Sequence, residues 1–138
     1  MTILVAYDGS RPAQKAVEYA VTHHGDEQLV LLRVIEISSG SIEAGIDLVQ
    51  EKVKEMREET TETLDEDVAE LIKRNKIDFE VETVVGKPSR EIVRYAEENQ
   101  IDSIIIGSHG RKGVSRVLLG NVAEIVVRRS PVTVTVVR

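Results

Sequence analysis

Three glycines in the last third of the chain have the spacing of a loop that could hold phosphate. They are Gly107, Gly110 and Gly120, with two residues in the first gap and nine in the second. Because glycine has no Cβ, such a backbone can take positive φ and turn its N–H groups toward phosphate oxygens. The pattern indicates a candidate anion site, but isolated glycine patterns are weak evidence, and an ordinary surface turn explains it equally well.

A helix is expected to begin just after Gly120, and it would add donors to the same place. Its first-turn amides, near Val122 and Ala123, have no acceptor inside the helix, and the helix dipole puts positive potential beside them. Arg111 and Lys112 could complete the neutralisation of a phosphate. These bases stand out because the chain as a whole carries a net charge of −6. An acidic protein with one basic, glycine-bearing segment has a plausible place for a small anion.

The elements that must position this segment follow from the spacing of the apolar residues. Continuous apolar runs are typical of strands buried on both faces, and the alternation of apolar and charged residues over 79–85 predicts an edge strand. The five predicted strands are residues 2–7, 29–34, 79–85, 103–106 and 132–137. Helical segments separate them, so the chain is predicted to be α/β: an open, doubly wound, five-stranded parallel sheet with helices on both faces, which is a Rossmann-like architecture.

The segments between the strands carry apolar residues at steps of three and four, as amphipathic helices do. Ser10 is a candidate cap for the first helix, with Pro12 in its first turn and Gly25 beyond its end. Ser89 is a candidate cap for the helix after the third strand. The acidic stretch over 42–71 predicts a helix or a pair of helices with the glutamates in solvent. The last helix is expected over 122–129.

Ligands of open α/β sheets bind beyond the carboxyl ends of the strands. Three of these ends carry unusual residues: Asp8 follows the first strand, residues 34–36 close the second, and Gly107 follows the fourth. Parallel strands bring these ends to one edge of the sheet. The sequence therefore predicts one site there, to which the glycine segment also belongs.

Composition limits what the site and its partners can be. A chain of 138 residues suits a single domain over 1–138, and its acidic charge argues against a nucleic-acid partner. No apolar run approaches the roughly 20 residues that cross a bilayer, and the amino terminus lacks a secretory signal, so a cytoplasmic protein without a membrane partner is expected. The absence of cysteine and the scattering of three histidines predict no thiolate nucleophile and no metal site.

Several stretches, taken together, resemble the universal stress protein family. They are VAYDGS at 5–10, IIIGSHGRKG at 104–113, LLGNVAE at 118–124 and RSPV at 129–132. The resemblance covers the whole chain in element order and length. The ATP-binding branch of this family has the pattern G-x-x-G-x9-G followed by Ser or Thr. This chain keeps all three glycines but has Asn121 in the last place, and the Asn121 amide can still donate to a phosphate oxygen.

The resemblance implies the adenine nucleotide alpha hydrolase-like form of the fold, with ATP or another adenine nucleotide as ligand, with or without Mg²⁺. Ala6 and Asp8 would border the nucleoside, with Asp8 near the ribose hydroxyls, and Val34 would offer its backbone to the adenine edge. The ribose and the first phosphates would be lined by Gly107, His109 and Gly110. The outer phosphates would be held by Gly120, Asn121, Val122 and Ala123.

Each of these residues also has a plainer explanation. Asn121 could cap its own helix, with Glu124 closing a capping box. Asp8 could cap the first helix or brace the turn before it, and Val34 is a core residue in any case. His109 is more simply a hydrogen-bonding loop residue, so no catalytic residue is predicted.

The last strand suggests a partner. Val132, Val134 and Val136 alternate with threonines and a further valine, and no charge protects this edge before Arg138. In the family that this chain resembles, the strand pairs with its mate across a two-fold axis, which implies a homodimer. The alternative is a monomer whose terminal strand is too short to cause aggregation.

Taken together, the resemblance implies a nucleotide-dependent regulatory module of the stress response. The sequence has no G-x-x-x-x-G-K-[ST] loop, no G-x-G-x-x-G turn and no cysteine, which argues against the common ATP-dependent enzymes. Two alternatives stay open. One is a stress protein without bound nucleotide that acts through protein contacts, and the other is a weak ATPase or an ATP-dependent enzyme of related fold.

Overall fold

Five parallel strands form one sheet in the order β3-β2-β1-β4-β5. The computed structural model describes residues 1–36, 66–108 and 120–138. The strands are β1 (Thr2–Ala6), β2 (Gln28–Ile35), β3 (Phe79–Val85), β4 (Ser103–Gly107) and β5 (Thr133–Val137). The helices of the described residues are α1 (Arg11–His23), α4 (Glu66–Arg74), α5 (Pro88–Glu98) and α6 (Asn121–Arg129). The predicted α/β class and the open, all-parallel sheet are confirmed.

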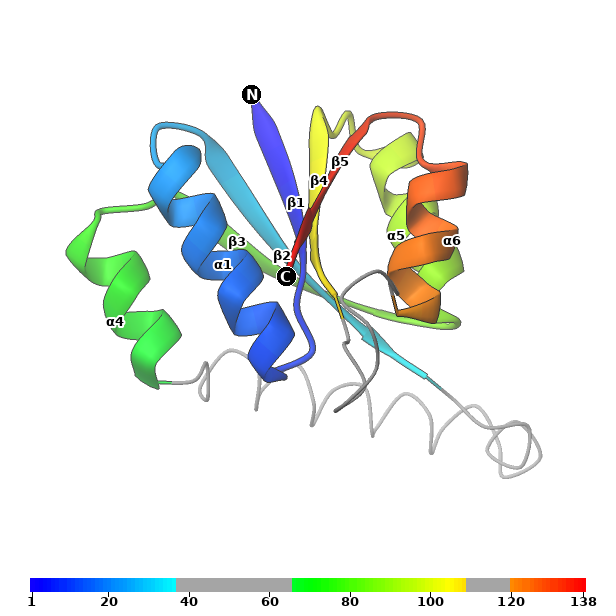
Figure 1. Ribbon diagram of the computed structural model, residues 1–138. Helices are drawn as coiled ribbons and strands as arrows, with labels where there is room; N and C mark the ends of the chain where they lie inside the picture. Colours follow the sequence, from blue (N-terminus) through cyan, green and yellow to red (C-terminus); the bar gives the residue numbers. More distant parts are fainter. Residues whose placement is uncertain (37–65, 109–119) are drawn as a thin grey trace, which may run out of the picture.

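Helices cover both faces of the sheet. Helices α1 and α4 lie on one face, and α5 and α6 lie on the other (Figure 1). Strand β1 is in the middle, and Ile3, Leu4 and Val5 are each 0% exposed. Ile3 and Val5 pack toward α1, whereas Leu4 packs toward α5 and α6, which explains why the sequence of β1 is continuously apolar.

Strands β3 and β5 form the two edges of the sheet, as the alternating and valine-rich sequences predicted. Strand β5 begins at Thr133, one residue later than expected. Val132 is held in a turn instead, because the Ser130 hydroxyl donates to the Val132 carbonyl at 2.7 Å and accepts from the Val132 N–H at 3.1 Å.

The start of α1 follows the predicted capping. Ser10 is the N-cap, and its Oγ accepts from the Ala13 N–H at 3.3 Å. The predicted cap of α5 was wrong: Lys87 is the N-cap, and Ser89 lies inside the first turn, 4% exposed. The reason is Pro88, which lacks an N–H and has a preset φ, so it takes the first helical position and moves the helix start ahead of Ser89.

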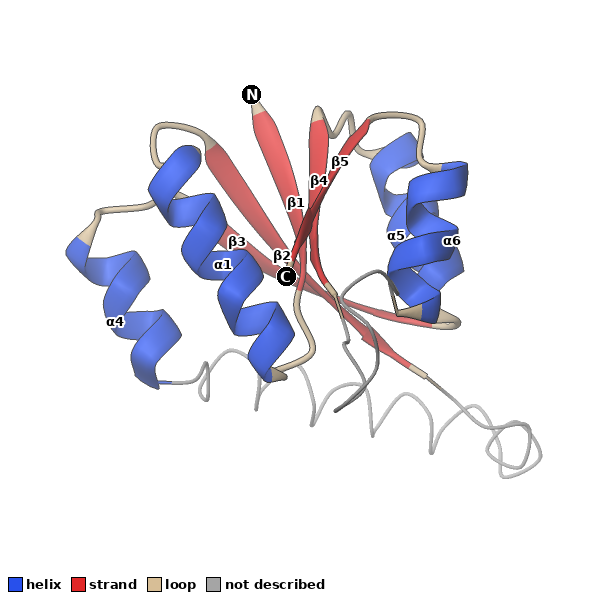
Figure 2. Cartoon of the chain, in the orientation of Figure 1, coloured by secondary structure: helices blue, strands red, loops and turns tan. Residues whose placement is uncertain are grey.

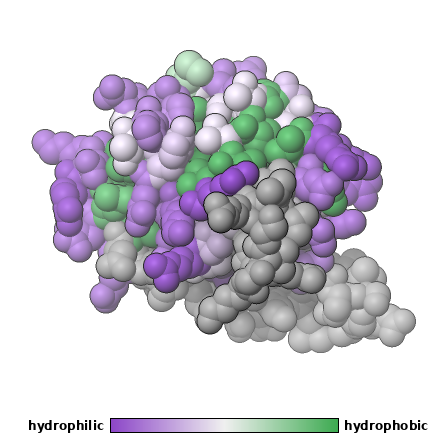
Figure 3. Space-filling view, viewed as in Figure 1, coloured by the Kyte–Doolittle hydropathy of each residue, from purple (hydrophilic) through white to green (hydrophobic). Residues whose placement is uncertain are grey.

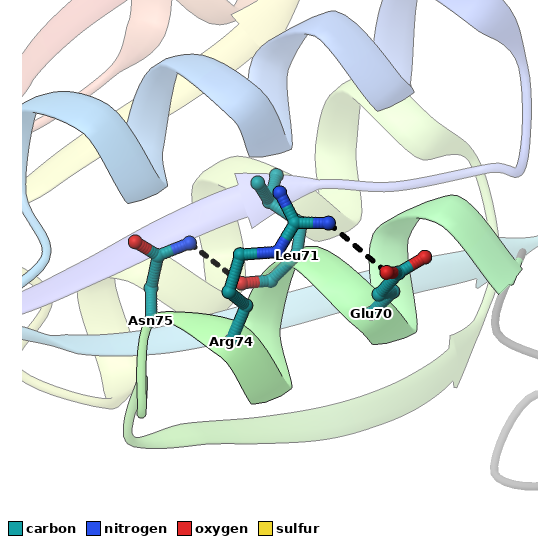
Figure 4. A network of polar contacts seen from close by, with 4 residues as sticks. All are labelled: Glu70, Leu71, Arg74 and Asn75. Atoms are coloured by element: carbon teal, nitrogen blue, oxygen red, sulfur yellow. Dashed lines mark hydrogen bonds and ion pairs between the residues drawn. The ribbon is translucent and has the colours of Figure 1, made fainter.

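The end of α4 shows how asparagine stops a helix in this chain (Figure 4). The Asn75 side-chain amide donates to the Leu71 carbonyl at 2.8 Å, while Arg74 pairs with Glu70 at 3.0 Å on the exposed side. The next residue, Lys76, takes φ of 52°, and the chain leaves the helix axis. The Leu71 carbonyl also accepts from the Asn75 backbone N–H at 3.2 Å, so the side chain adds a second hydrogen bond to the last turn of the helix.

Helix α4 confirms the last part of the helical segment predicted over 42–71, and the rest of that segment lies outside the described residues. Within the parts of the chain that the structure describes, no helix has the length and apolar character to cross a bilayer. Figure 2 shows that α1, α5 and α6 all begin at the edge of the sheet where the strands end.

Candidate functional site

A pocket of about 250 Å³ lies at that edge of the sheet. It is formed by the carboxyl ends of β1, β2 and β4 together with the first turns of α1, α5 and α6. Its lining residues are Ala6, Tyr7, Asp8, Ser10, Ala13, Leu32, Val34, Glu36, Pro88, Ile92, Ile106, Gly107 and Val122. The structure thus brings together five of the predicted site residues: Ala6, Asp8, Val34, Gly107 and Val122.

The inner side of the pocket is apolar. Leu32, Ile92 and Ile106 are 1%, 3% and 4% exposed, and they come from β2, α5 and β4. Ala6 and Val34 lie against the same core cluster. Such a surface suits a flat, weakly solvated group such as a nucleobase, because burying its faces removes apolar area from water.

Val34 offers main-chain groups to this pocket. Strand β1 ends at Ala6, and the Tyr7 N–H donates to the Leu32 carbonyl at 2.9 Å as the last bond between the two segments among the described residues. Residues two apart in a strand direct their N–H and C=O to the same side. The N–H and C=O of Val34 therefore face the side that β1 has left, where the pocket lies.

Asp8 does brace the turn that precedes α1. Its Oδ1 accepts from the Ser10 N–H at 2.9 Å, and Gly9 between them has φ of 81°. A non-glycine residue at position 9 would be strained, because this φ favours glycine. The bond fixes the direction of the carboxylate, and Asp8, which is exposed, also lines the pocket. The plainer explanation of Asp8 and a place in the site are therefore compatible.

The predicted reason for Gly107 was wrong. Among the described glycines, positive φ occurs at Gly9 and Gly86 and not at Gly107. A Cβ at position 107 would instead overlap the carbonyl group of Pro12 in the first turn of α1. The next amide, of Ser108, donates to the Val137 carbonyl at 2.8 Å. Gly107 thus permits a close approach between β4 and α1. The Ser108 N–H forms a hydrogen bond to β5 and does not point toward a ligand.

The entrance of α6 differs from both the predicted capping and the predicted glycine conformation. Gly120 is the N-cap, with φ of −61° and ψ of 157°, and as a glycine it has no side chain with which to cap the helix. Asn121 is the first helical residue, so it does not cap its own helix, and the Glu124 carboxylate pairs with Arg128 at 2.8 Å instead of closing a capping box. Neither Gly120 nor Asn121 nor Glu124 therefore caps the first-turn amides of α6 with its side chain.

The other predicted residues of this segment either lie near the pocket or fall outside the described residues. Val122 lines the pocket, Asn121 is exposed, and Ala123 is 1% exposed in the core under α6. His109, Gly110, Arg111 and Lys112 lie outside the described residues.

Eight lining residues had not been predicted as ligand-binding residues: Tyr7, Ser10, Ala13, Leu32, Glu36, Pro88, Ile92 and Ile106. Glu36 alone among them belongs to a stretch, 34–36, that the sequence predicted at this edge. A signal existed for two of them. Leu32 and Glu36 stand two residues before and after Val34, and strand side chains repeat every second residue on one face. Pro88 and Ile92 could not be found this way, because they come from a helix start that only the fold brings to this edge.

The charge of the described lining is negative. Asp8 and Glu36 are its acidic residues, and no lysine or arginine is among the thirteen described residues that line the pocket. Positive potential comes from the helix starts of α1, α5 and α6, which converge on this edge (Figure 1). This arrangement suits a ligand with a neutral, hydrogen-bonding part in the pocket and an anionic part toward the helix starts.

Solved structures of the same fold hold nucleotides. A universal stress protein in complex with cAMP is 23% identical, with a TM-score of 0.67 over 100% of this chain and 96% of that chain. A universal stress protein family protein of Arabidopsis thaliana with AMP bound is 16% identical, with a TM-score of 0.66 over 99% of this chain and 90% of that chain. At these identities the likeness concerns the fold.

Sequence comparison shows to which family the chain belongs. The universal stress protein MJ0577 of Methanocaldococcus jannaschii is 33% identical over 99% of this chain and 93% of its own length. Its solved structure aligns with a TM-score of 0.75 and 30% identity over 99% of this chain and 94% of that chain. The profile of the Universal stress protein family matches residues 1–138. The chain therefore belongs to the universal stress protein family.

Proposed function

We propose that this protein binds an adenine nucleotide, with ATP as the ligand in the cell, and acts as a nucleotide-dependent regulatory module of the stress response. The observation that carries the proposal is the pocket itself. The cavity lies at the topological switch point of the sheet, between β1 and β4, and its inner side is apolar. It combines a main-chain donor and acceptor at Val34 with a carboxylate at Asp8. Related structures that hold cAMP and AMP support the same ligand class.

The nucleoside would occupy the apolar part of the pocket. The base would lie against Leu32 and Ile92, with its edge toward the main chain of Val34. A Val34 N–H can donate to a ring nitrogen of adenine, and the Val34 carbonyl can accept from its amino group. The Asp8 carboxylate, held by Ser10, would accept from the ribose hydroxyls.

The phosphates would extend toward α6. Its N-cap, Gly120, has no side chain to cap the first-turn amides, and its dipole favours an anion at that end. A triphosphate carries more negative charge than a monophosphate, so more of its charge needs neutralisation. Mg²⁺ bound to the phosphates would supply it, which predicts that Mg²⁺ improves the affinity for ATP more than the affinity for AMP.

Two measurements test the proposal. The purified protein is first denatured, and the released small molecules are identified. The stripped protein is then titrated with ATP, ADP, AMP and GTP, with and without Mg²⁺. Release of an adenine nucleotide, or micromolar binding of one with at least about tenfold weaker binding of GTP, supports the proposal. Absence of any binding up to millimolar concentration overturns it and leaves the branch of the family that acts through protein contacts alone.

We also propose a homodimer through β5. This strand is a sheet edge whose Val134 and Val136 are half-buried, and Figure 3 shows apolar side chains gathered along it on the face toward the viewer. Unprotected edges pair readily, and antiparallel pairing of two β5 strands across a two-fold axis would join two sheets into one.

A further inference from the structure

Glu36 is the acidic residue at the end of β2, and its place in the pocket suggests a specific use. It lines the same cavity as Leu32 and Val34, which precede it by four and two residues. Leu32 and Val34 lie on the face of the strand that α5 covers, and Glu36, the first residue after the strand, lines the same pocket. Glu36 is exposed, so its carboxylate lies at the open end of an otherwise apolar row.

The end of β2 is held firmly enough to position this residue. Ile35 accepts from the Gly86 N–H at 2.9 Å, which ties the last residue of β2 to the turn after β3. Val34 is paired in register with Val84 of the same neighbour. Glu36 directly follows Ile35, so these bonds also fix the position of its backbone, close to the main-chain groups of Val34 that face the pocket.

We propose that the Glu36 carboxylate recognises the exocyclic amino group of the bound base, and that it makes the pocket selective for 6-aminopurines over 6-oxopurines. The inference rests on the proposed nucleotide site and adds a specificity-determining side chain to it. An ionised carboxylate only accepts hydrogen bonds. An amino group directed at the end of β2 can satisfy both the Val34 carbonyl and Glu36, whereas an oxo group there meets two acceptors.

The second acidic residue of the described lining, Asp8, follows a different strand. Asp8 comes after β1, where it is bound to the Ser10 N–H, and Glu36 comes after β2. The two carboxylates therefore have separate tasks: Asp8 faces the sugar and Glu36 faces the base edge. A pocket that repels the oxo group in this way discriminates by leaving polar groups of the wrong ligand without a partner.

AMP and IMP test this inference, because they have the same ribose and phosphate and differ at position 6 of the purine. Both are titrated into the purified protein, into Glu36→Ala and Glu36→Gln, and into Glu97→Ala as a control that removes the same charge from an exposed position on α5. The wild type and the Glu97 control are expected to prefer AMP by about 100-fold. Glu36→Ala should lower this preference about tenfold or more. Glu36→Gln should lower it as well, because the Gln amide can donate to an oxo group as readily as it accepts from an amino group.

The outcomes separate this inference from the proposed function. If neither AMP nor ATP binds the wild type, the nucleotide site fails, and Glu36 fails with it. If AMP binds but IMP binds equally well, or if Glu36→Ala keeps the full preference, the role of Glu36 is refuted while the nucleotide site stands. A loss of preference in the Glu97 control as well would also refute it, because net charge would then explain the effect.

Discussion

The carbonyl group of Pro12 occupies the space that a side chain at Gly107 would need. Pro12 lies in the first turn of α1, and Gly107 is the last residue of β4, so the contact joins the two elements at the edge of the pocket. Because the position of a Cβ is fixed by its own backbone and the nearest atoms belong to the backbone of Pro12, the overlap cannot be relieved without displacing the helix or the strand. The absence of a side chain at Gly107 thus sets the distance between α1 and the sheet.

The first prediction follows from this contact. Gly107→Ala should lower the free energy of unfolding by about 1–3 kcal/mol, as overpacking of a dense interior does. The measurement is urea denaturation followed by circular dichroism. Ser103→Ala, at the opposite end of the same strand, is the control and should change stability by less than about 0.5 kcal/mol. A Gly107→Ala protein as stable as the wild type would show that α1 can shift freely.

The second prediction separates the two tasks of Asp8. In Asp8→Asn the side-chain oxygen can still accept from the Ser10 N–H, so the turn and the melting temperature should be preserved. The negative charge of the carboxylate that would accept hydrogen bonds from the ribose hydroxyls is lost, so the affinity for AMP should fall about tenfold to 100-fold. Asp8→Ala should lose affinity and stability together. Asp78→Asn, exposed before β3, is the control, and an unchanged affinity in Asp8→Asn would refute the ribose contact.

The third prediction concerns alkaline pH. Burial raises the pKa of the Tyr95 phenol above its ordinary value of 10.0, with Glu82 and Glu80 of β3 adding to the effect. The folded state then keeps this proton to higher pH than the unfolded state does. The stabilisation is complete below pH 10 and is lost as pH rises through the folded pKa. In denaturation series between about pH 9 and 11, the wild type should lose stability more steeply than Tyr95→Phe; parallel curves would contradict this.

The fourth prediction tests the dimer. Thr135→Lys places a charge in the middle of the edge strand β5, and in a symmetric dimer the two lysines would approach each other near the axis. Light scattering after size exclusion should show a dimer for the wild type and for Thr22→Lys on the exposed side of α1, and a monomer for Thr135→Lys. A monomeric wild type, or a dimer that survives Thr135→Lys, would exclude pairing through β5.

Local patterns predicted the elements well because each element is determined by its own residues. The apolar run of β1, the Ser10 cap of α1 and the alternation of β3 all act within a few positions of the chain. Errors arose where two local signals competed, as when Pro88 took the helix start that Ser89 was expected to cap.

The site was predicted in part. Asp8, Val34 and Gly107 were expected at one edge because parallel strands end together, and the pocket contains all three. The role of Gly107 was missed, because its contact with Pro12 joins residues far apart in the sequence and only packing reveals it. Ile92 and Pro88 were missed for the same reason, since helix α5 reaches the pocket through the crossover of the chain.

The most direct test of the account is a crystal structure of the protein grown with saturating ATP and Mg²⁺. The account predicts the base between Val34 and Ile92, the ribose at the Asp8 carboxylate, and the phosphates toward the first turn of α6. If the nucleotide lies elsewhere, or if this pocket stays empty while ATP is in excess, the central claim is wrong.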